Sequence, residues 1–114
     1  LDIELPAGCN DETYLATLNH WLKQIGQRAG DFDMIFFQAG VDGLEHDRLG
    51  RMCLTHEGLK RRNELVFDFA YDRSVPLVIS MGGGYPQNGA SWAPILEAHA
   101  TVYFQAHQYL AKRA

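Results

Sequence analysis

The sequence is poor in cysteine and carries little excess charge. Two cysteines, Cys9 and Cys53, stand among 114 residues; they are too few for a disulfide framework, and neither belongs to a CxxC pair. A reducing, cytoplasmic setting is therefore expected. The net charge is −4, and Lys60–Arg62 is the one basic cluster, which a solvated helix face explains. These features argue against nucleic-acid binding through phosphates. No apolar run approaches the length of a membrane span, so no membrane partner is expected.

The apolar residues that are present alternate between two patterns. Met34–Phe37 is a short, continuous apolar run that leads to Gly40, and Leu77–Ser80 is a second run that leads to three glycines. Runs of this kind predict strands that are buried on both faces. Leu1–Leu5 alternates apolar and acidic residues, which predicts a short edge strand that Pro6 ends.

Between these runs the apolar residues follow helical spacing. Three helices are predicted, and the polar residues expected to cap them are Asn10, Thr55 and Ser91. Strands that alternate with helices indicate an α/β protein with a parallel sheet, three layers and right-handed crossovers.

Two polar side chains follow the two central strands. Asp42 stands just beyond the first and Tyr85 just beyond the glycines that follow the second. Because the carboxyl ends of parallel strands meet at one edge of a sheet, both should lie on the same rim and face a common cavity. Asp42 can ligate a cation or orient a base, or it can simply cap the turn after Gly40. Tyr85 can donate to a developing oxyanion, or its ring can pack over a tight turn.

The loop after Asp42 contains Glu45, His46 and Asp47. A metal cluster within this loop is conceivable, although Asp47 is better explained by hydrogen bonds to backbone amides of its own loop. The glycines at 82–84 would let a ligand approach the backbone closely, and a phosphate is one such ligand. However, the sequence around them matches neither G-x-G-x-x-G nor a P-loop.

Two blocks of this sequence resemble a known family. QAGVDGLEHDRLGRMCLT and VPLVISMGGGY resemble the C-terminal part of the histone deacetylase superfamily, most of all its class IV type and related bacterial deacetylase-like proteins. The opening, with Leu5-Pro6, Asp11-Glu12 and Tyr14-Leu15, is similar as well. The resemblance implies the arginase/deacetylase-like α/β/α fold. It also implies that residues 1–114 are the C-terminal part of a single domain whose N-terminal part is absent from this chain, as the start without Met suggests.

The resemblance also implies roles for individual residues. Asp42 matches the last of three zinc ligands and Tyr85 the catalytic tyrosine, while Leu49, Gly83 and Gly84 match residues of the acyl-lysine channel. The implied chemistry is zinc-assisted amide hydrolysis of acyl-lysine or acylpolyamine substrates, with Zn²⁺ as cofactor and a His as general base and acid.

The family's tandem His pair and its Asp-x-His motif have no match in this sequence. The chain alone is therefore expected neither to hold zinc tightly nor to catalyse, and to associate with itself through uncovered apolar faces. Two alternatives stay open. One is a non-catalytic α/β binding or interaction module that keeps the deacetylase fold. The other is a nucleotide-binding half-domain that uses Gly82–Gly84.

Overall fold

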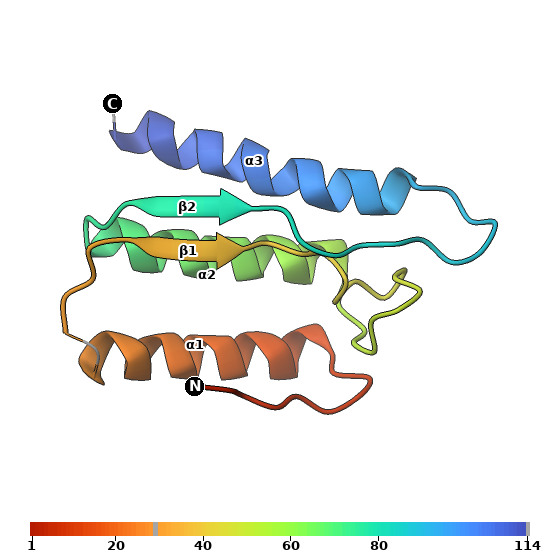
Figure 1. Cartoon of the computed structure of the whole chain (residues 1–114), viewed down its shortest axis with the longest axis horizontal. Helices are drawn as coiled ribbons and strands as arrows, with labels where there is room; N and C mark the ends of the chain where they lie inside the picture. The colour runs from red at the N-terminus through yellow and green to blue at the C-terminus, as the bar shows by residue number, and fades with distance from the viewer. Residues whose placement is uncertain (29, 114) are drawn as a thin grey trace.

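The computed structural model describes residues 1–28 and 30–113, which form three helices and a two-stranded sheet (Figure 1). No helix in this part of the chain has the length and apolar character needed to cross a membrane. The elements in chain order are α1 (Asp11–Arg28), β1 (Ile35–Gln38), α2 (His56–Asp72), β2 (Leu77–Ser80) and α3 (Ala93–Arg113).

Polar side chains accept hydrogen bonds from backbone N–H groups at the start of each helix, as the sequence predicts. The bonds are Thr13 N to Asn10 Oδ1 (3.0 Å), Gly58 N to Thr55 Oγ1 (3.0 Å) and Ala93 N to Ser91 Oγ (3.1 Å). The Asp11 carboxylate in the first turn of α1 also accepts from the Thr55 amide at 2.9 Å and from its hydroxyl at 2.5 Å. This pair of bonds ties the start of α1 to the start of α2.

The two strands run parallel, in a register that pairs Ile35 with Leu77 and Gln38 with Ser80. Helix α2 connects them, so β1, α2 and β2 form a βαβ crossover. This arrangement confirms the predicted parallel sheet. The carboxyl ends of both strands consequently point to the same edge of the sheet.

The helices cover one face of this sheet. Phe37, Leu77 and Ile79 point toward α2 and α3, where they pack beside Phe67 and Val102. Helix α2 lies behind the strands, between α1 and α3 (Figure 1). The described chain is flat, and its shortest dimension is 19 Å.

The opposite face of the sheet is open in the described chain. Phe36 is 76% exposed and Val78 is 40% exposed, and both strands alternate between half-buried and exposed residues. The prediction that these runs are buried on both faces is therefore wrong for this chain, because it supplies helices to one face only. The predicted strand at Leu1–Leu5 is also wrong, since these residues form no strand and most are exposed.

A second apolar cluster lies beyond the carboxyl end of β1. It is centred on the loop between β1 and α2, where Val41, Leu44 and Leu54 are at most 1% exposed, and it includes Leu59 of α2 and Ile95 of α3. The loop is also held by hydrogen bonds, including Leu54 N to Gly43 O at 3.1 Å. This long connection is therefore anchored by buried apolar side chains, which helps to fix the positions of its polar side chains.

Candidate functional site

The segments that follow β1 and β2 lie side by side. Val41 N donates to Gly83 O at 2.7 Å, which continues the pairing of the strands beyond the sheet. A Cβ placed on Gly82 would lie 2.8 Å from the Cα of Gly40, so this approach requires glycine. The backbone thus joins the Asp42 and Tyr85 loops at their base.

Asp42 lies against the glycine turn after β2. Its carboxylate carbon and one carboxylate oxygen would each be 3.4 Å from a Cβ on Gly83, so a side chain there would touch the carboxylate. Asp42 and Gly83 line a polar pocket of about 260 Å³ whose wall also includes Tyr14 of α1 and Arg62 of α2. The Asp42 carboxylate is exposed to this pocket and is available to a ligand.

Asp47 is a buried carboxylate, 4% exposed, that binds backbone amides. Its Oδ2 accepts from Leu49 N at 2.8 Å and from Gly50 N at 2.6 Å, as the sequence predicts for an Asp in this loop. Its Oδ1 accepts from Tyr85 N at 2.6 Å, which the sequence did not reveal because Tyr85 is 38 residues away. One carboxylate therefore fixes both loops of the site.

Tyr85 is held by its backbone and by one aromatic neighbour. Its carbonyl accepts from Arg48 N at 2.9 Å, and its ring meets that of Trp92 edge-on with centroids 6.4 Å apart. The Tyr85 side chain remains 45% exposed. It lines a second hollow of about 210 Å³, in which Arg48 Nη1 donates to Asn88 Oδ1 at 2.6 Å.

The three predicted channel residues lie on these same two loops. Leu49 is 63% exposed and follows directly on the Asp47–Arg48 segment. Gly84 is buried, and a Cβ there would lie 2.5 Å from Val41 Cγ2 and 3.1 Å from His99 Nε2. The structure thus gathers all five predicted residues on two joined loops, with Asp42 and Tyr85 facing different hollows.

Arg62 is a polar residue of this region that the sequence did not single out. The sequence predicted a solvated helix face for Lys60–Arg62; this is wrong for Arg62, which is 6% exposed. Its Nη1 donates to the Gly40 carbonyl at 2.5 Å. Burial lowers the pKa of Arg62, and the neighbouring Tyr14 and Asp42 oppose that shift. Burial likewise raises the pKa of the Tyr14 hydroxyl.

Side chains that could bind a metal do not cluster in the part of the chain that the structure describes. Within residues 1–28 and 30–113, no three His, Cys, Asp or Glu side chains gather closely enough to hold a metal ion. Glu45 and His46 are exposed, and the Asp47 carboxylate is already occupied by three amides. Catalytic zinc takes three protein ligands. The exposed carboxylate of Asp42 fits one of those positions.

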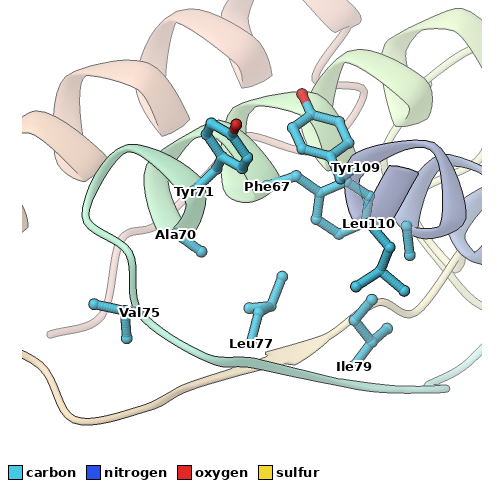
Figure 2. A pocket seen from close by; sticks show the side chains of 9 residues that line it. Phe67, Ala70, Tyr71, Val75, Leu77, Ile79, Tyr109 and Leu110 are labelled. Carbon is cyan, nitrogen blue, oxygen red and sulfur yellow. The ribbon is translucent and has the colours of Figure 1, made fainter. Parts of the chain in front are cut away.

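A different pocket, on the helix-covered face of the sheet, is lined by apolar side chains and by Tyr71 and Tyr109. Figure 2 shows its side chains converging from α2, α3 and β2, with Leu77 and Ile79 facing Phe67 and Tyr109. Its volume is about 190 Å³. It lies toward the start of β2, whereas Asp42 and Tyr85 follow the ends of the strands. The apolar pocket is therefore separate from the candidate site.

Two curated proteins are similar to this chain in sequence. A curated uncharacterized protein of Picosynechococcus is 39% identical over 88 residues, which cover 77% of this chain and 29% of that protein. Histone deacetylase 2 of Arabidopsis thaliana is 32% identical over 88 residues, which cover 77% of this chain and 22% of the plant protein. The chain therefore spans less than a third of the length of these relatives.

The crystal structure of acetylpolyamine aminohydrolase from Burkholderia pseudomallei superposes with a TM-score of 0.71 at 22% identity. The match covers 92% of this chain and 27% of that structure, and it confirms the predicted arginase/deacetylase-like α/β fold. The sequence model of the histone deacetylase domain matches residues 1–101. This chain belongs to the histone deacetylase domain family.

Proposed function

We propose that the intact protein is a zinc-dependent amidohydrolase that removes acyl groups from acyl-lysine or acylpolyamine substrates, and that this chain contributes part of its active site. The observation that carries the proposal is the joining of the Asp42 and Tyr85 loops at the carboxyl ends of two parallel strands. A carboxylate and a phenol on one sheet rim are groups that can bind a metal and donate to an oxyanion.

In this proposal Asp42 is one of the zinc ligands. A bound zinc ion would polarise the acyl carbonyl and lower the pKa of a water molecule. The Tyr85 hydroxyl donates a hydrogen bond to the oxygen that becomes negatively charged. Its position depends on the backbone bonds from Tyr85 to Asp47 and Arg48, and on the contact of its ring with Trp92. Leu49, Gly83 and Gly84 form part of the wall along which the acyl chain enters.

The remaining ligands and the acid–base His belong, in this proposal, to the N-terminal part of the same domain. The open sheet face, with Phe36 at 76% and Val78 at 40% exposure, supports this because large exposed apolar patches usually mark a surface that another element covers. The isolated chain should then be inactive, hold zinc poorly and associate with itself through that face. The proposed setting of the intact protein is the cytoplasm, where its two free cysteines would stay reduced.

One observation favours the alternative of a non-catalytic module. The described residues hold no three-ligand group, so the fold could persist here without the chemistry. In that case the intact protein would bind an acylated ligand, or a protein partner, without hydrolysing it. The two functions differ in whether metal is bound and amide bonds are cleaved.

The test is to purify the intact gene product and measure its zinc content together with hydrolysis of an acetyl-lysine peptide and of an acetylated polyamine. About one zinc per protein and release of free amine from either substrate are expected. Loss of both in Asp42→Asn would tie the activity to this chain. A metal-free, folded protein with no hydrolysis of either substrate would refute the enzymatic proposal and favour the module.

A further inference from the structure

Arg62 on α2 has its guanidinium fixed at several points. Nη1 donates to the Gly40 carbonyl at 2.5 Å, while Nε and Nη2 both donate to Asn63 Oδ1 at 3.1 and 2.9 Å. The guanidinium carbon also lies 5.3 Å from the centre of the Phe37 ring, a cation–π distance. The planar fork is thus held in one orientation at the end of β1, which a lysine could not reproduce.

The residues that hold Arg62 are themselves fixed by α3. Asn63 Nδ2 donates to Gln105 Oε1 at 2.8 Å, and Gln105 Nε2 donates to the Lys60 carbonyl at 3.2 Å. Asn63 and Gln105 are 1% and 6% exposed. Among the described residues, every buried side-chain nitrogen and oxygen has a partner. The network therefore connects α2 and α3 to a carbonyl that lies two residues beyond the end of β1.

That carbonyl belongs to the turn that carries the candidate ligand. Gly40 precedes Asp42 by two residues, and a Cβ on Gly40 would lie 3.1 Å from Asp42 Oδ1. Arg62, Tyr14 and Asp42 line the same pocket. The attraction of Asp42 is one of the influences that keep the pKa of Arg62 from falling further on burial. Arg62 thus shares the wall of one pocket with Asp42 and also supports the backbone that leads to it.

We propose that Arg62 is a positioning residue for Asp42: it fixes the Gly40 carbonyl, and so the turn that aims the carboxylate. The inference rests on the proposed role of Asp42 as a metal ligand. Groups that orient metal ligands without touching the metal typically change its affinity by about 10- to 100-fold. Arg62 should therefore affect metal affinity beyond its effect on folding.

The experiment measures zinc affinity by chelator competition, and stability by urea unfolding, on the intact gene product. The variants are Arg62→Met and Arg62→Lys. The first removes the charge and every side-chain N–H donor, whereas the second keeps the charge and an N–H donor but loses the planar guanidinium. Gln105→Met is the matched control, because it removes the buried bonds between α3 and α2 while the direct bond from Arg62 to Gly40 and the lining of the Asp42 pocket stay in place. Arg62→Met should weaken zinc binding about 10-fold or more, Arg62→Lys should weaken it less, and the control should stay within about 2-fold of wild type.

Zinc affinity unchanged in a folded Arg62→Met protein would overturn the inference, and so would an equal loss in Gln105→Met. If Arg62→Met does not fold, the comparison rests on Arg62→Lys, where affinity equal to wild type overturns the inference and weakened affinity supports it. A wild-type protein that binds no zinc refutes the proposed function itself. If the wild-type protein binds zinc and the Arg62 variants bind it with the same affinity, only the positioning role is refuted.

Discussion

Replacing Asp47 with Asn should separate the two loops of the site. The carboxylate accepts three amides, two at Oδ2 and the Tyr85 amide at Oδ1. Asn offers one oxygen and one NH₂ group. If the oxygen stays toward Leu49 and Gly50, which keeps two bonds, the NH₂ group faces the Tyr85 N–H and that bond is lost.

The cost of Asp47→Asn follows from the bond that is lost. A hydrogen bond to a charged group contributes about 1.5–3 kcal/mol, and a buried donor without a partner costs a similar amount. Part of this is recovered because the Tyr85 side chain is 45% exposed and water can approach its loop. The expected loss of unfolding free energy is about 3 kcal/mol. With a urea slope of about 2 kcal/mol per molar, the midpoint should fall by roughly 1.5 M.

The assay is urea unfolding of the 114-residue chain, followed by circular dichroism, with amide hydrogen exchange as a local readout. In Asp47→Asn the Tyr85 amide should exchange faster, while the Val41 amide keeps its bond to Gly83 and its protection. Glu45→Gln is the matched control, an acid-to-amide change at an exposed position of the same loop, and should stay within about 0.5 kcal/mol. Equal midpoints for the two variants, or an unchanged Tyr85 amide, would refute the reasoning.

Three further outcomes are expected. Tyr85→Phe in the intact protein should leave zinc content unchanged and lower kcat by about 10²–10³, the effect of one lost oxyanion donor; wild-type turnover would contradict its proposed role. Asp42→Asn should lower zinc content and abolish deacylation, and full metal occupancy by elemental analysis would count against it. Burial, and secondarily Arg62, lowers the pKa of His99. Below a pH of about 6.5 the unfolded chain therefore binds more protons at this residue than the folded chain does, and stability should fall as the pH drops. Urea midpoints between pH 7.5 and 5.5 should show a weaker fall in His99→Leu, and identical pH slopes would argue against this linkage.

Local patterns in the sequence were enough to predict the helices and the parallel strands. Asn10 and Thr55 cap helices because their side chains bond amides three residues away, within the reach of a local pattern. Met34–Phe37 and Leu77–Ser80 were correctly read as strand segments because both are short apolar runs that end in glycine. Their burial was overestimated for a different reason. An apolar run shows what a strand requires, whereas cover on its second face depends on elements that this chain does not supply.

The candidate site was predictable to the extent that it depends on strand ends. Asp42 and Tyr85 could be placed on one rim because parallel strands dictate it. The common cavity expected for them is not seen among the described residues, where the two side chains line separate hollows. The contacts that it missed are distant in the chain. Arg62 bonds to Gly40 across 22 residues, and Asp47 to Tyr85 across 38. Arg62 looked like a surface residue because it follows two other basic residues in the sequence, Lys60 and Arg61. These two are indeed exposed.

Both long-range contacts join a buried charged side chain to the backbone of a loop. In the described part of the chain, Asp47 and Arg62 are the buried residues that carry a formal charge, and each is bonded to the backbone of a loop that bears a candidate group. A buried charge is costly unless its hydrogen bonds are complete, so each is stable only when the backbone it binds is in one place. Arg62 thereby specifies the turn that leads to Asp42, and Asp47 the turn that leads to Tyr85. Two buried charges of opposite sign thus fix the two loops of the site. Substitution of Arg62 should therefore displace Asp42 more than Tyr85, and substitution of Asp47 should displace Tyr85 more than Asp42.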